Sequence, residues 1–155
     1  MSVGAPPFSL TPLLELVIEL GPLHSLGAGA AGERRFAEIK GGHISGAGIT
    51  ATLDYGRDDQ FLRADGTLEI DATYMFRTAS GARLKVVNQG MRHGPPDVLA
   101  RLGAGEAVPR DSYFFATTIR FETSDADLDH FNRVIAVAQA SRRGGEVIFD
   151  IWQIG

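Results

Sequence analysis

The stretch FLRADGTLEIDATYMF, residues 61–76, contains the alternation that decides the fold. From Thr67 onward, apolar and polar side chains alternate, which is the two-residue period of a β-strand with two different faces. The Asp65-Gly66 pair just before this run is a turn signal. The two faces carry these residues: Leu68, Ile70, Ala72, Tyr74 and Phe76 on one, and Thr67, Glu69, Asp71, Thr73 and Met75 on the other. Two carboxylates therefore share a face, which is either a wet exterior or the lining of a cavity.

The rest of the chain repeats this kind of segment. Glycine residues, 19 in all, separate short runs rich in β-branched and aromatic side chains. The runs cover residues 13–20, 44–53, 67–76, 82–90, 112–122, 134–142 and 146–154. Their spacing is too short for crossover helices between parallel strands. We therefore expect an all-β fold, a single antiparallel β-barrel of about eight or more strands.

Two stretches have helical features. Residues 95–105 begin with proline and end at glycine, while residues 124–133 open on Ser124, a good helix cap, followed by acidic residues. Both are short enough to flank or plug a sheet. We expect residues 1–155 to form one domain, with residues 1–12 as a loose N-terminal arm.

Composition excludes several classes of protein. The 15 Lys and Arg residues against 19 Asp and Glu residues give a net charge of -4, which argues against a nucleic-acid partner. The absence of cysteine rules out disulfides and fits a reducing compartment. No apolar run approaches the length of about 18 residues that spans a membrane. We expect a cytoplasmic protein with no membrane partner.

Motifs for cofactors, metals and nucleophiles are weak. The segment GAGAAG, residues 27–32, has the glycines of a dinucleotide-binding turn but neither a strand directly before it nor a long helix after it. The four histidines show no metal-ligand spacing, and Ser45 lacks the GxSxG spacing of a hydrolase. We therefore expect no cofactor, no metal and no hydrolase triad.

Polar side chains at alternating strand positions are the main functional clue. A barrel of about eight strands can enclose one small ligand, and buried carboxyl groups near arginines can supply acid and base forms at neutral pH. The candidate catalytic residues are Asp58, Asp71, Tyr74 and Tyr113. The candidate substrate-binding residues are Arg63, Asn88, Arg92, Phe115, Thr117, Phe121, Glu122, His130 and Asn132. The alternative for each polar residue is an ordinary solvated outer face.

The order of motifs along the chain resembles the domain of unknown function 3237 family of small bacterial and fungal proteins. The matching segments are GERR (32–35), IKGGHISG (39–46), GRDDQFLRADG (56–66), LEIDATYMFRT (68–78), GMRHGP (90–95), YFFATTIRFET (113–123) and HFNR (130–133). The resemblance implies a single-domain antiparallel β-barrel and carries no established reaction.

In the strand at residues 67–76, only one of Asp71 and Tyr74 can point inward. If solvent covers the outer face of the barrel, Tyr74 should point inside. If helices or a second subunit cover that face, Asp71 should point inside. We expect Asp71 to face the interior, because Arg63, Arg92 and Asn132 are available as partners for a buried carboxylate.

We expect an enzyme of the isomerase, cyclase or lyase kind that acts without a cofactor on an apolar, ring-bearing or polyketide-like metabolite. Asp58 or Asp71 would move a proton with Tyr74 or Tyr113, while Arg63 or Arg92 would hold an oxyanion. The first alternative is a non-catalytic barrel that binds a small apolar ligand. The second is a structural protein that uses the aromatic strand at residues 112–122 as the interface of a homo-oligomer.

Overall fold

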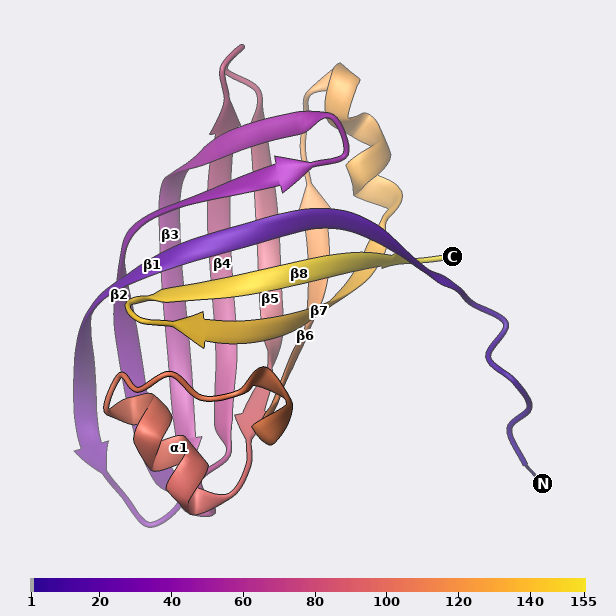
Figure 1. Ribbon diagram of the computed structural model, residues 1–155. Helices are drawn as coiled ribbons and strands as arrows, with labels where there is room; N and C mark the ends of the chain where they lie inside the picture. The colour runs from indigo at the N-terminus through magenta and orange to yellow at the C-terminus, as the bar shows by residue number, and fades with distance from the viewer. Residues whose placement is uncertain (1) are drawn as a thin grey trace.

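Eight strands follow the chain in order around a closed barrel, in a computed structural model that describes residues 2–155 (Figure 1). The elements are β1 (Leu10–Ala28), β2 (Gly32–Gly46), β3 (Ile49–Arg63), β4 (Leu68–Thr78), β5 (Arg83–His93), α1 (Pro96–Gly103), η1 (Arg110–Ser112), β6 (Phe114–Glu122), η2 (Ala126–Arg133), β7 (Ile135–Arg143) and β8 (Glu146–Ile154). The predicted antiparallel barrel is therefore confirmed.

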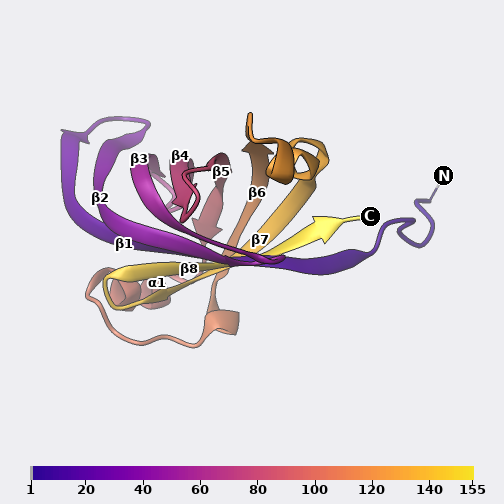
Figure 2. The same cartoon turned by 90° about the horizontal axis from the view of Figure 1, so that it is seen from above.

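The barrel closes because β1 pairs antiparallel with β8 as well as with β2. In Figure 1, β3, β4 and β5 run lengthwise behind, while β1 and β8 cross in front of them at a steep angle. The view from above shows β1 and β2 curving from one layer into the other (Figure 2). Every strand that the structure describes thus has two neighbours, and closure removes the free edges that would pair with another chain.

The bend in β1 lies at Gly21-Pro22. The pairing of β1 with β2 shifts register between Leu20 and Leu23, on either side of this dipeptide. Proline has no N–H to donate to a ladder, so it occurs in strands at edges and bulges, and a bulge bends the strand that carries it. This bend turns the second half of β1 toward the end of the barrel covered by α1.

The predicted run at residues 44–53 is a hairpin and not one strand. Ala47 and Gly48 have φ angles of 50° and 79°, which matches the tight two-residue turns that join twisted strands. The strand β2, whose apolar alternation is interrupted by Gly41-Gly42, was missed from the sequence. The segment GAGAAG, residues 27–32, covers the end of β1, a short turn and the start of β2. Our expectation that no strand directly precedes it is therefore wrong, but a strand and not a helix follows it.

The apolar face of β4 is the interior face. Tyr74 and Phe76 are at most 1% exposed, whereas Asp71 on the opposite face is exposed. Our expectation that Asp71 faces inward is therefore wrong. The outer face of β4 is not covered by a helix, so its carboxylate stays hydrated and the aromatic residues of the same strand fill the core.

The helices α1 and η2 lie at opposite ends of the barrel (Figure 1). Leu102 of α1 is buried in the core at one end, and Leu128 and Phe131 of η2 are buried at the other. Asp125, and not the predicted Ser124, caps η2, because its side chain accepts a hydrogen bond from the backbone N–H of Asp127.

The N-terminal arm is shorter than expected. Residues 2–9 belong to no strand or helix, but Leu10, Thr11 and Pro12 already pair with β8. Within residues 2–155, no helix is long and apolar enough to cross a membrane. The cytoplasmic location stays a prediction.

Candidate functional site

A cavity of about 230 Å³ lies inside the barrel at the end where α1 packs. All eight strands and α1 contribute to its wall. The lining residues are Ile18, Leu20, Gly21, Leu23, Arg35, Ala37, Asp58, Gln60, Leu68, Ile70, Tyr74, Arg92, Gly103, Phe115, Arg142, Val147 and Phe149. A concave site with apolar walls and a few converging polar groups is the usual form of a small-molecule site.

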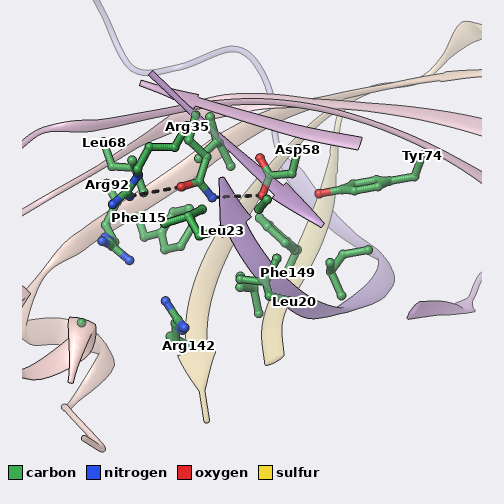
Figure 3. A pocket seen from close by; sticks show the side chains of 17 residues that line it. Leu20, Leu23, Arg35, Asp58, Leu68, Tyr74, Arg92, Phe115, Arg142 and Phe149 are labelled. Carbon is green, nitrogen blue, oxygen red and sulfur yellow. Dashed lines mark hydrogen bonds between the residues drawn. The ribbon is translucent and has the colours of Figure 1, made fainter. Parts of the chain in front are cut away.

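Three polar side chains form a chain of hydrogen bonds along one wall (Figure 3). Arg35 Nη2 donates to Gln60 Oε1 at 3.1 Å, and Gln60 Nε2 donates to Asp58 Oδ2 at 3.2 Å. Asp58 and Gln60 alternate inward on β3, so both reach the cavity from one strand. The second carboxylate oxygen of Asp58, Oδ1, is buried without a hydrogen-bond partner. No described residue therefore satisfies this oxygen.

Burial raises the pKa of Asp58 from 3.8 to about 6. The hydrogen bond from Gln60 and the charge of Arg35 act in the opposite direction, and the nearby carboxylates Asp59 and Asp71 add a smaller upward push. A carboxyl group with a pKa near 6 exchanges its proton readily close to neutral pH. Such a group suits general acid–base chemistry.

Tyr74 projects into the cavity with its hydroxyl directed toward Asp58 (Figure 3). Burial and the charge of Asp58 raise the pKa of its phenol, so the group remains protonated at neutral pH. Asn88, which is fully buried, donates from Nδ2 to the phenol oxygen at 3.5 Å. Tyr74 is therefore a fixed hydroxyl next to a carboxylate whose charge can change.

Arg92 and Arg142 bring positive charge to the same cavity. The Arg92 guanidinium lies 6.0 Å from the centroid of the Phe115 ring, at the long end of the cation–π range. Burial, and the neighbouring charges of Arg142 and Arg35, lower the pKa of Arg92 to about 10. Apolar side chains, including Leu20, Leu23, Phe115 and Phe149, make up much of the remaining wall (Figure 3).

Among residues 2–155, no cluster of three or more His, Asp or Glu side chains is arranged to hold a metal ion. The polar groups of the cavity are one carboxyl, a phenol, an amide and three guanidinium groups. This set favours proton transfer and hydrogen bonding to a small molecule.

Comparison with known proteins decides the family. The family model described as Protein of unknown function (DUF3237) matches residues 8–154. The chain belongs to the DUF3237 family.

Relatives of this DUF3237 protein share its barrel. A UPF0311 protein of Rhodopseudomonas palustris is 34% identical over 152 residues, covering 94% of this chain and 99% of the relative. Its crystal structure, that of a conserved protein of unknown function, has a TM-score of 0.90 and covers 98% of this chain and 100% of the other. A beta-barrel like protein from Acinetobacter baumannii AYE is 33% identical, with a TM-score of 0.81 and coverage of 99% and 100%.

A more distant structure shares the fold. The crystal structure of an enzyme from Penicillium herquei has a TM-score of 0.74 at 22% identity, and the match covers 100% of both chains. At this identity the similarity establishes the barrel alone.

In this DUF3237 barrel, four of the predicted site residues line the cavity, namely Asp58, Tyr74, Arg92 and Phe115. Asn88 does not line the cavity but donates a hydrogen bond to the hydroxyl of Tyr74. Tyr113 and Thr117 are buried but do not line the cavity, and the Tyr113 hydroxyl accepts a hydrogen bond from the backbone N–H of Arg142 at 3.2 Å.

The remaining predicted site residues lie elsewhere on the DUF3237 barrel. Asp71 accepts from Gln89 on the outer face, Arg63 pairs with Glu69 at 2.8 Å, and Glu122 pairs with exposed Lys85 at 3.3 Å. Their strand positions point outward, where water solvates their charges.

The end of the DUF3237 barrel that carries η2 holds the last three predicted residues. Phe121 packs edge-on against Phe131 with ring centroids 5.1 Å apart, and exposed His130 tilts against the same ring. Asn132 bonds the backbone of Thr123 through both atoms of its amide. These contacts are structural and remote from α1 (Figure 1).

Sequence reasoning missed Arg35, Gln60 and Arg142 as residues of the cavity. Gln60 shares the inward parity of Asp58 on β3, so alternation along residues 56–63 could have indicated it. Arg35 lies on a strand that was not recognised, and Arg142 lies at the end of a strand whose neighbours are known only once the barrel is closed.

Proposed function

We propose that this barrel is a cofactor-independent enzyme of the isomerase, cyclase or lyase kind, which moves a proton on a small, largely apolar, ring-bearing metabolite. One observation carries the proposal: Asp58 and Tyr74 project from neighbouring strands into the same cavity, which apolar side chains and a few polar groups line together. The volume of about 230 Å³ is smaller than that of a typical pocket for a drug-sized ligand, so it restricts the occupant to a small molecule. A single fold can host many functions, so the residues of the site and not the barrel itself indicate the reaction.

The two side chains would have different roles. The Asp58 carboxylate would take a proton from a carbon beside a carbonyl group of the substrate, while Tyr74 donates a hydrogen bond to the carbonyl oxygen as negative charge develops there. The proton held by Asp58 would then return to another atom of the same molecule. The step conserves atoms and electrons and needs no second reactant.

The Penicillium herquei neighbour is consistent with this reading, since its barrel is described as that of an enzyme. At 22% identity this bears on the fold and transfers no substrate or residue role. If the cavity binds a ligand without changing it, the protein is a binder of small apolar molecules, which is the second candidate.

The experiment begins with native mass spectrometry of freshly purified protein, followed by extraction and identification of any compound that co-purifies. That compound and its close relatives are then incubated with wild-type protein and with Asp58→Asn, Tyr74→Phe and Asp71→Asn variants. We expect turnover to fall by roughly 100-fold or more in Asp58→Asn, which removes the base. Asp71→Asn is the matched control, because the Asp71 side chain lies on the outer face of the barrel and does not reach the cavity.

Folded Asp58→Asn and Tyr74→Phe proteins that convert the compound at the wild-type rate would rule out the proposed roles. Tight binding of the compound by every variant, with no conversion by the wild-type protein, would identify the non-catalytic binder.

A further inference from the structure

The arginines that line the cavity carry more positive charge than the carboxylate in its wall can neutralise. Three arginines, Arg35, Arg92 and Arg142, line it, and Asp58 is the one carboxylate among the described lining residues. With Asp58 ionised, the wall carries two more positive charges than negative charges. The protein as a whole has a net charge of -4, so this concentration of positive charge is local.

None of the three arginines forms an ion pair in the part of the chain that the structure describes. Arg35 donates to the neutral amide of Gln60, and Arg142 Nε donates to the backbone oxygen of Gly144 at 3.3 Å. The Nε atoms of Arg35 and Arg92 are buried without a hydrogen-bond partner. Buried donors are almost always satisfied in folded proteins, so the described residues leave donor capacity of Arg35 and Arg92 unused beside the cavity.

The arginines also occupy a defined part of the site. In Figure 3, Arg92 and Arg142 lie beside Phe115 on the side of the cavity away from Tyr74, while Gln60 bridges from Arg35 to Asp58. The cavity therefore has a cationic end and an acid–base end. Apolar side chains, including Leu23 and Phe149, line the space between them.

We propose that the substrate or ligand of this cavity is a small organic carboxylate whose anionic group binds among Arg35, Arg92 and Arg142 and whose apolar ring lies toward Asp58 and Tyr74. This inference rests on the proposed function and adds the chemical class and the orientation of the molecule. The guanidinium fork matches the geometry of a carboxylate and presents several donors to it. The apolar walls and the small volume favour a small ring system of one or two rings with one acidic group over a nucleotide or polyphosphate.

The two ends of the cavity would orient the bound molecule. A carboxylate held by the arginines would fix the ring with one edge facing Asp58 Oδ1 and the Tyr74 hydroxyl. Fixing the reacting carbon near its base is a major source of catalytic rate. The arginines would then be binding and positioning residues, and Asp58 and Tyr74 the groups that touch the reacting atoms.

Two probes of nearly equal shape test the charge requirement. Binding of 2-naphthoate and of neutral 2-naphthamide is measured by isothermal titration calorimetry at pH 7.5 on wild-type protein, Arg92→Met, Arg142→Met and Arg143→Met. Arg143 is the matched control, since it is exposed at the end of the same strand as Arg142 and does not line the cavity.

We expect wild-type protein to bind the naphthoate at least about tenfold more tightly than the amide, because hydrogen bonds to charged groups are stronger than neutral ones. Arg92→Met and Arg142→Met should each lose most of this preference, and Arg143→Met should keep it. Circular dichroism on each variant checks that the barrel is folded. Methionine preserves much of the apolar stem of arginine while removing its charge.

Equal binding of both probes by wild-type protein would overturn the inference and leave the cavity and the proposed function in place. A naphthoate preference that survives undiminished in both folded cavity variants would also overturn it, because the anion would then be recognised without help from Arg92 or Arg142. Binding of neither probe would count against the inference and, with a clean native mass spectrum, against the proposed function as well.

Discussion

Asp58 and Asp71 show that the chemistry of a carboxyl group depends on whether it faces the interior of the barrel or the solvent. Both are aspartates on adjacent strands of the same barrel, yet Asp58 is 8% exposed and Asp71 faces solvent beside Gln89. Moving a carboxylate out of water favours its neutral form. At the scale of the residue, burial is what makes Asp58 a candidate acid and base.

The same burial carries a cost in stability that depends on pH. The pKa of Asp58 rises from 3.8 to about 6 on folding, so the folded protein binds this proton more tightly than the unfolded chain does. The contribution of protonated Asp58 to the free energy of unfolding is complete below about pH 4 and is lost as the pH rises through about 6. By pH 7.5 the loss amounts to about 3 kcal/mol, at about 1.4 kcal/mol for each pKa unit.

We therefore predict that Asp58→Asn is more stable than wild-type protein at pH 7.5, by up to about 3 kcal/mol. The advantage should shrink as the pH falls from 6 to 4, because wild-type Asp58 becomes neutral. Urea unfolding at several pH values measures both proteins, with Asp71→Asn as the exposed control. A constant difference between Asp58→Asn and wild type across this pH range would show that Asp58 is not titrating in a buried site.

At the scale of the element, alternation along a strand decides which residues reach the cavity. The alternation in β4 predicts two faces, but the sequence does not say which face is covered, and our choice of Asp71 was wrong. The missing information is tertiary: the outer face of β4 has no helix over it, whereas α1 and η2 pack at the ends of the barrel (Figure 1). In β2, glycines interrupt the alternation of apolar and polar residues, so the sequence does not reveal this strand.

The pairing of β5 with β6 depends on a residue without a side chain. A Cβ atom added to Gly90 would clash with the backbone oxygen of Ala116 and lie 2.6 Å from Thr117 Cα. The two strands would have to separate, close to Arg92 and Phe115 of the cavity. We predict that Gly90→Ala destabilises the protein by about 3 kcal/mol, at the upper end for overpacking.

The matched control for this substitution is Gly41→Ala in β2, where the added Cβ would meet just one atom, Glu19 Oε2, at an ordinary 3.6 Å. Thermal or urea unfolding compares the two variants with wild type. If Gly90→Ala proves as stable as Gly41→Ala, the close approach of β5 to β6 is not the constraint that the structure indicates.

At the scale of the whole molecule, closure of the barrel assembles a site that no single segment contains. The fold class could be predicted because short alternating runs and glycine turns repeat along the chain. Asp58, Tyr74, Arg92 and Phe115 could be nominated from their residue types and positions. Arg35 and Arg142 could not, because they come from strands that are distant in the sequence and meet only across the closed interior.

The proposed chemistry requires that the closed barrel hold Asp58 in a buried position as a group that titrates near neutral pH. The direct measurement is a ¹³C NMR titration of the aspartate carboxyl carbons, with the Asp58 signal assigned from Asp58→Asn protein. We predict an apparent pKa of about 6 for Asp58. A midpoint near 4, the value of a hydrated carboxyl group, would rule this out, because Asp58 would then have neither the burial nor the proton affinity that the proposed chemistry requires.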